Sequence, residues 1–188
     1  NTFLGTLSGS KCTGNNNTYL GKDTGKENTT GHSNTAVGRS ALEANTTQND
    51  NVAIGFQAMA FAASERSTII GCHAGENNDL SGDNNTGIGY QALEDTTTGQ
   101  FNTAVGARCL RENTTADNNT GVGNDALKNN TTGSNNTGIG EGALESNTTA
   151  SHNTAVGTYA LDANTTGAFN TGIGRGSLSE NTTADNNT

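Results

Sequence analysis

The chain has 188 residues, a net charge of −9, 29% apolar residues, 4% aromatic residues, and neither Trp nor Pro. This composition argues against an ordinary globular core, and the single, scattered acidic residues argue against nucleic acid or an anionic membrane surface as a partner. No apolar stretch approaches the roughly 18–20 residues of a membrane span, so we predict no membrane insertion.

One 17-residue unit is copied along the chain. It reads NTAVGARCLRENTTADN at 102–118 and NTGVGNDALKNNTTGSN at 119–135. The glycine that closes the N-T-x-[V/I/L]-G motif marks eleven copies: Gly5, Gly21, Gly38, Gly55, Gly71, Gly89, Gly106, Gly123, Gly140, Gly157 and Gly174. A short fixed period means that each unit buries its apolar face by stacking on its neighbours. We therefore predict an all-β, parallel β-solenoid (a β-roll or β-helix) of about eleven 17-residue coils.

In chain order, residues 1–188 are predicted to form a single β-solenoid domain, and because both ends lie inside a repeat we expect a segment of a longer chain. Residues 1–33 form irregular coils, with Phe3 and Tyr19 where later coils carry Ala or Gly. Residues 34–84 are semi-regular, with an aberrant coil at 71–84 whose segment 76–83 is interpreted as a solvated loop insertion and not a calcium loop. Residues 85–188 keep the 17-residue repeat throughout.

Each coil can be interpreted as two short strands joined by turns. In the first strand, alternation places Thr103 and Val105 on one face and Ala104 on the other. Val52 replaces the threonine in one coil, which indicates that the Thr/Val face points inward. The small residues of the other face, Ala or Gly, are then predicted to contact a neighbouring subunit. The predicted core ladder comprises Val37, Ile54, Ile70, Ile88, Val105, Val122, Ile139, Val156 and Ile173, together with Leu93, Leu110, Leu127, Leu144, Leu161 and Leu178.

The Asn-Thr-Thr corner carries an N-glycosylation sequon in most coils. The candidate sites at this position are Asn28, Asn45, Asn113, Asn130, Asn147, Asn164 and Asn181. Two interpretations stay open. Asn and Thr are suited to corners and to amide ladders, so that the sequons arise from composition, or the sequons coat a secreted rod with sugar.

No constellation of catalytic residues is found. The three histidines and the three cysteines (Cys12, Cys72 and Cys109) each fall at different positions of the repeat, which argues against a metal site and against a disulfide ladder. The glycines are not followed by Lys-Ser/Thr at the spacing of a phosphate loop. We predict no enzyme, and no catalytic, cofactor-binding or metal site.

The motif Asn51-Val52-Ala53-Ile54-Gly55 resembles the head repeats of YadA-like trimeric autotransporter adhesins. The longer form NTGIGYQAL at 85–93 is similar to the repeat arrays of phage and large-virus tail fibres. The resemblance covers essentially the whole chain, and it implies a homotrimer with the coils wound about a common axis. The coil is longer than in the adhesin heads and has an Asn-Thr-Thr corner, which favours the viral fibre over the adhesin.

From these observations we predict the structural shaft of an extracellular or virion-surface fibre, a rigid spacer for host attachment. A host-surface glycan or receptor would be bound by another part of the chain. The alternatives are a self-assembling extracellular filament or matrix glycoprotein whose solenoids stack end to end, and an ice- or glycan-binding solenoid that uses the Thr columns.

Overall fold

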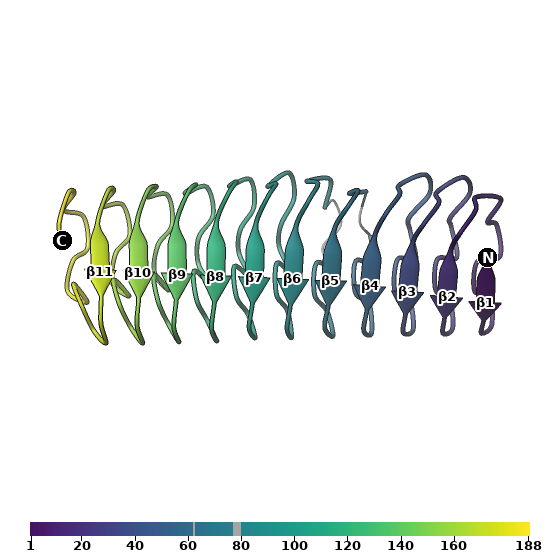
Figure 1. Cartoon of the computed structure of the whole chain (residues 1–188), viewed down its shortest axis with the longest axis horizontal. Helices are drawn as coiled ribbons and strands as arrows, with labels where there is room; N and C mark the ends of the chain where they lie inside the picture. Colours follow the sequence, from purple (N-terminus) through teal and green to yellow (C-terminus); the bar gives the residue numbers. More distant parts are fainter. Residues whose placement is uncertain (62, 77–79) are drawn as a thin grey trace.

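The computed structural model describes residues 1–61, 63–76 and 80–188. These residues form a parallel β-solenoid, as predicted, with eleven short strands in one sheet whose spatial order is their order in the chain (Figure 1). The strands are β1 (Thr2–Leu4), β2 (Thr18–Leu20), β3 (Thr35–Val37), β4 (Val52–Ile54), β5 (Thr68–Ile70), β6 (Thr86–Ile88), β7 (Thr103–Val105), β8 (Thr120–Val122), β9 (Thr137–Ile139), β10 (Thr154–Val156) and β11 (Thr171–Ile173).

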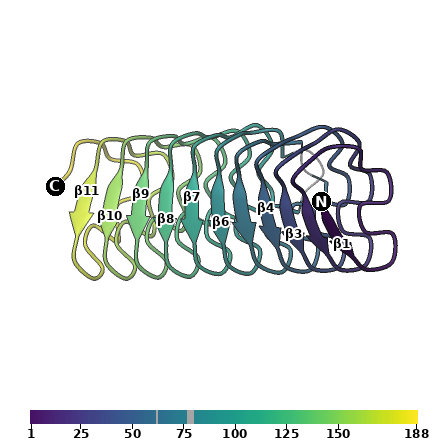
Figure 2. The ribbon, with the colours of Figure 1, turned by 45° about the vertical axis from the view of Figure 1, so that its right-hand side comes forward.

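The coils stack into a rod with the two termini at opposite ends (Figures 1 and 2). Each strand pairs in parallel with the equivalent strand of the next coil, so that Thr103 lies beside Thr120 and Val105 beside Val122. Ten such steps of about 4.8 Å give an array about 48 Å long. Among the described residues each coil contains one three-residue strand and not two, because the rest of the coil follows turns.

The glycine after each strand is required by the backbone and by its neighbour. Gly106 has a φ of 141°, a region that side-chain-bearing residues rarely adopt. A Cβ atom added to Gly106 would lie 2.2 Å from the carbonyl oxygen of Gly123 in the next coil. The arc beyond it turns through further residues of positive φ, such as Arg108 (54°) and Leu110 (50°).

The predicted orientation of the strand is wrong. The middle residue, for example Ala104, is completely buried, whereas Thr103 and Val105 point outward and are partly exposed. A Cβ added to Gly138 would lie 3.2 Å from Cγ of Leu127, so the interior facing the strand has room only for a small residue. The Val/Ile half of the predicted core is therefore an outer column: Val37, Ile54, Ile70, Ile88, Val105, Val122, Ile139, Val156 and Ile173.

The leucine half of the predicted core is buried. Five of its members have no exposed surface: Leu93, Leu110, Leu127, Leu144 and Leu161. Leu178, in the last coil of the array, is partly buried and packs against the same cluster. Because the middle strand residue is Ala or Gly, the leucine reaches across the coil and fills most of its apolar interior.

In some irregular coils the large and the small interior residue change places, so that the interior is still filled. Tyr19 takes the place of the small strand residue, and Gly25 takes the place of the leucine; a Cβ on Gly25 would lie 2.4 Å from the Tyr19 ring. Ile69 and Gly75 make the same exchange in the coil of β5. The segment 76–83, interpreted above as a loop insertion, includes residues 77–79, which lie outside the described residues.

Candidate interaction surface

The interior of the rod is lined by asparagines as much as by leucines. In the first amide ladder, formed by the asparagine that precedes every strand except β5, where Ser67 takes its place, Oδ1 of Asn102 accepts a hydrogen bond from the backbone N–H of Asn119 at 3.0 Å. Nδ2 of Asn119 donates to the carbonyl of Gly133 at 2.9 Å. Each asparagine thus ties its own coil together and links it to the next one, which satisfies buried polar groups that would otherwise be costly.

The seven sequon asparagines form a second amide ladder and not an exposed column. Nδ2 of Asn130 donates to Oδ1 of Asn113 at 3.0 Å and to the carbonyl of Gly133 at 2.8 Å. Six of these residues are completely buried, and Asn181, in the last coil of the array, is partly buried: Asn28, Asn45, Asn113, Asn130, Asn147, Asn164 and Asn181. A glycan on such a nitrogen would replace an interior hydrogen bond and has no space in this fold. The interpretation of this column as glycosylation sites is therefore wrong.

The second amide ladder is interrupted near the middle of the rod. Thr97 pairs with Thr114, so Thr96 occupies the place beside Asn113 where an asparagine would continue the ladder. The Oγ1 atom of Thr96 is buried without a hydrogen-bond partner, as is Oδ1 of Asn45 on the other side of the interruption.

Thr96→Asn is expected to extend the ladder and to raise the free energy of unfolding by about 1 kcal/mol, the usual net value of one intramolecular hydrogen bond. The new Oδ1 would accept from Nδ2 of Asn113, and the new amide would donate to the carbonyl of Gly99, as the equivalent groups do in later coils. Urea unfolding measures the change. Thr98→Asn, at an exposed position two residues away, serves as the control, and an equal gain there would contradict the ladder explanation.

The surface that the sequence interpretation missed is the outer face of the sheet, which we call the strand face. It consists of the first and third residues of β1–β11, a column of threonines (with Val52 in β4) beside a column of Val, Ile or Leu. No charged residue occurs in any of these strands. In most strands the first and third residues are β-branched and the middle residue is Ala or Gly. This pattern could have indicated that the two outer residues are exposed and that the middle one faces a crowded interior.

The threonine hydroxyls of the strand face are free for solvent or a ligand. None of the strand threonines, such as Thr103 or Thr120, uses its hydroxyl in a hydrogen bond within the described part of the chain. The first threonine of the Asn-Thr-Thr corner behaves differently, because Oγ1 of Thr114 donates to the carbonyl of Thr131 at 3.0 Å and so belongs to the internal scaffold. The strand face is therefore an array of hydroxyls that the fold leaves without partners.

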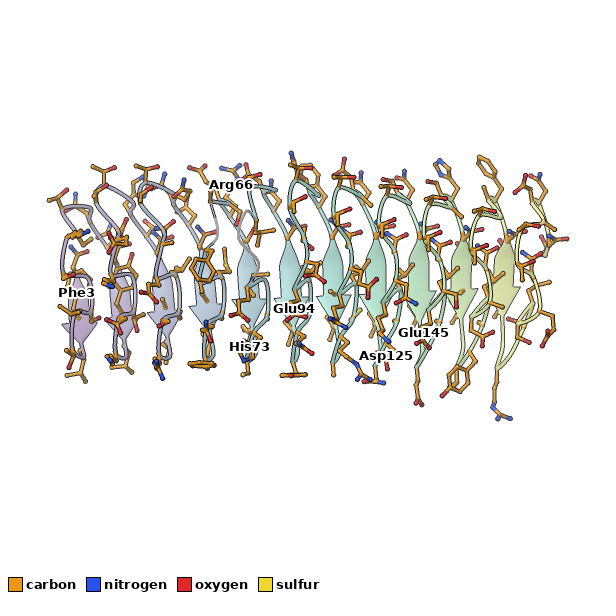
Figure 3. The ribbon with its side chains drawn as sticks, turned by 180° about the vertical axis from the view of Figure 1, so that it is seen from behind. Phe3, Arg66, His73, Glu94, Asp125 and Glu145 are labelled. Atoms are coloured by element: carbon orange, nitrogen blue, oxygen red, sulfur yellow. The ribbon has the colours of Figure 1, made fainter. Side chains whose placement is uncertain are left out.

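Some of the charged residues lie on the arcs on the other side of the coil, where Glu94, Asp125 and Glu145 are labelled in Figure 3. Arg108 forms a two-bond contact with Asp125 at 2.8 and 2.6 Å, and this contact raises the pKa of the Arg108 guanidinium. Lys128 lies between Asp125 and Glu145, at 3.9 and 3.6 Å. The Arg108–Asp125 and Lys128–Glu145 pairs join neighbouring coils, but partly exposed ion pairs of this kind contribute little stability.

The remaining polar residues do not assemble into a reactive centre in the part of the chain that the structure describes. No group of three or more metal-ligating side chains occurs there, and no pocket is found. The three cysteines are free thiols, and burial raises the pKa of the Cys109 thiol to about 12, which keeps it protonated. His73 pairs with Glu76, His152 stacks on Phe169, and His32 is exposed.

The described residues contain no helix with the length and apolar character needed to cross a membrane. No protein-family model, no curated protein and no solved structure matches the chain.

Proposed function

We propose that this chain is the shaft of an extracellular or virion-surface fibre, a rigid spacer in which copies of the chain associate side by side as a homotrimer. The observation that carries the proposal is the uninterrupted register of β1–β11, in which every strand pairs with the next and buried amides join most of the coils. Such an array resists bending and offers few loops to proteases. It performs no chemistry, and its length sets the distance between its two ends.

The strand face is the surface by which we propose that the copies associate. The Ala/Gly column, which the sequence favoured for this contact, points into the coil and cannot reach another subunit. The Val/Ile column is instead continuous, uncharged and partly exposed, with Ile139 at 39% exposure. An aliphatic column of this length gains by being removed from water. The strand face measures roughly 500 Å², less than the roughly 800 Å² per partner of a standard interface, so we expect association to depend on concentration.

Light scattering across a concentration series tests this proposal. The unchanged chain is expected to approach the mass of a trimer, and Val122→Lys, which places an ammonium in the middle of the Val/Ile column, is expected to keep it monomeric. Thr132→Lys, on the exposed Asn-Thr-Thr corner, is the matched control and should associate like the unchanged chain. A well-folded chain that stays monomeric at every concentration would refute the homotrimeric shaft.

A second candidate function, ice binding, is supported by the free hydroxyls of the strand face. Threonine and Val/Ile side chains alternate there with a repeat of about 4.8 Å along the rod and about 6.7 Å along each strand, an array that can order water as ice does. In this case the chain would be a monomer that inhibits ice recrystallisation, and Thr120→Lys would abolish the inhibition. A trimer without effect on ice would exclude this function.

The structure gives little support to the filament or matrix glycoprotein. That hypothesis places N-linked glycans on the seven sequon asparagines, but these residues form the second amide ladder inside the rod.

A further inference from the structure

One corner of the rod carries aromatic rings at positions where the backbone disfavours them. This corner immediately precedes each strand and includes Arg66, which is labelled at the upper edge of Figure 3. Its residues all have positive φ, between 54° and 63°. They are Asn16, Ser33, Asp50, Arg66, Asn84, Phe101, Asn118, Asn135, His152, Phe169 and Asn186.

Asn and Asp tolerate this left-handed conformation well, and six of the eleven positions carry them. A bulky phenylalanine there is an outlier. The Phe101 and Phe169 side chains are also 56% and 58% exposed, so burial does not compensate for the backbone strain. A strained residue that the fold does not need is a reason to look for a function.

Phe101, Asn118, Asn135, His152 and Phe169 follow one another along this corner, and we call them the ring corner. The rings of His152 and Phe169 stack with centroids 4.9 Å apart and an angle of 6° between their planes. Asn118 and Asn135 lie between this pair and Phe101, and both are exposed. Their side-chain amides make no hydrogen bond among the described residues. The ring corner spans four coil steps, about 19 Å.

The surroundings of the ring corner carry several hydroxyls and two carboxylates. Ser134 and Ser151 precede two of its members, and the exposed Thr132 and Thr149 lie on the same arc. Two carboxylates lie beside it: Asp117 accepts a hydrogen bond from the backbone N–H of Gln100 at 2.7 Å, and Asp185 accepts one from the backbone N–H of Ala168 at 2.7 Å. No Lys or Arg belongs to the ring corner, so it has no permanent positive charge with which to attract a phosphate, a nucleic acid or an acidic sugar.

We propose that the ring corner binds a neutral oligosaccharide that lies along the rod axis. A pyranose ring presents an apolar C–H face that can pack against Phe101 or Phe169, and its hydroxyls can both donate to and accept from the amides of Asn118 and Asn135. The ligand needs no charge, which matches the site. This inference goes beyond the fibre proposal, since it gives the side of the shaft a binding activity of its own, and it does not require a homotrimer.

Isothermal titration with cellotetraose and with chitotetraose tests the proposal. The unchanged chain is expected to bind at least one of these neutral tetrasaccharides. The triple variant Phe101→Asn/His152→Asn/Phe169→Asn should bind it about tenfold more weakly or not at all, because the stacking platforms are lost. Since Asn is the residue that neighbouring coils carry at this position, the urea midpoint of the triple variant should stay the same or rise. Tyr90→Asn, an exposed ring on the corner that follows the strand, is the control and should bind normally.

Three results would overturn the proposal. The first is that the unchanged chain binds neither tetrasaccharide. The second is that the triple variant binds as tightly as the unchanged chain. The third is that the triple variant changes its mass in light scattering, because the rings would then be contacts between copies of the chain. A monomeric chain that binds the tetrasaccharide would refute the homotrimer and leave the glycan site standing, so the two proposals fail separately.

Discussion

Gly106→Ala is expected to destabilise the rod by several kcal/mol, more than the about 1–3 kcal/mol that an unfavourable backbone region costs by itself. The added methyl would lie 2.2 Å from the Gly123 carbonyl oxygen and 2.5 Å from its carbonyl carbon. Both atoms belong to the backbone of the next coil, which is paired on both sides and cannot move away without breaking the ladder. Urea unfolding followed by circular dichroism measures the loss.

Gly174→Ala separates the two causes. Gly174 occupies the same position of the repeat with a φ of 114°, but a Cβ there would have no atom within 4 Å. Its variant should therefore lose only the backbone contribution, about 1–3 kcal/mol. Equal losses in the two variants would show that the approach of neighbouring coils does not demand the glycine.

Asn147→Asp is expected to cost about 3–5 kcal/mol at pH 7, because it buries a carboxylate without a positive partner. Nδ2 of Asn147 donates to Oδ1 of Asn130 at 2.7 Å and to the carbonyl of Ala150 at 3.0 Å. In the variant a carboxylate oxygen would face these two acceptors. Only the hydrogen bond that Asn164 donates to Asn147 at 3.1 Å could remain.

The loss should depend on pH in a defined direction. Burial among acceptors disfavours the charged form, so the folded-state pKa of the carboxyl group that Asn147→Asp introduces lies above its unfolded value of about 3.9. Stability is then retained below about pH 4, where the neutral carboxyl can donate one hydrogen bond, and it is lost as the pH rises through the folded pKa. Asn135→Asp is the exposed control on the ring corner, and it should show little change at either pH. A pH-independent loss for Asn147→Asp would contradict a buried amide ladder.

The repeat by itself determined the solenoid. The 17-residue spacing of the motif glycines predicts stacked coils, and the recurring Ala-Leu pair identifies the leucines that fill them. The sequence also predicted why a glycine recurs after each strand, namely a positive φ or a close approach of the neighbouring backbone. At Gly106 both reasons apply. These features are local or strictly periodic, so the order of residues along the chain is enough to predict them.

Only the tertiary structure decided which side of each strand is inside. Alternation separates Thr103 and Val105 from Ala104, but it does not say which set is buried. Hydrophobicity favoured the valine. The volume left by Leu110 and its equivalents, which arrive from the opposite arc of the coil, admits only Ala or Gly. That volume is set by residues that are not neighbours along the strand, so no property of the strand reveals it.

The sequence could not decide the role of the sequon asparagines for a similar reason. An Asn-Thr-Thr corner satisfies the requirements of a glycosylation site and of an amide ladder equally well. Asn130 becomes interior because its amide meets a carbonyl three residues later and the amide of Asn113 seventeen residues earlier. The second of these partners comes within reach only when a whole coil has closed on the one before it, and that closure is a property of the stacked rod and not of any one repeat.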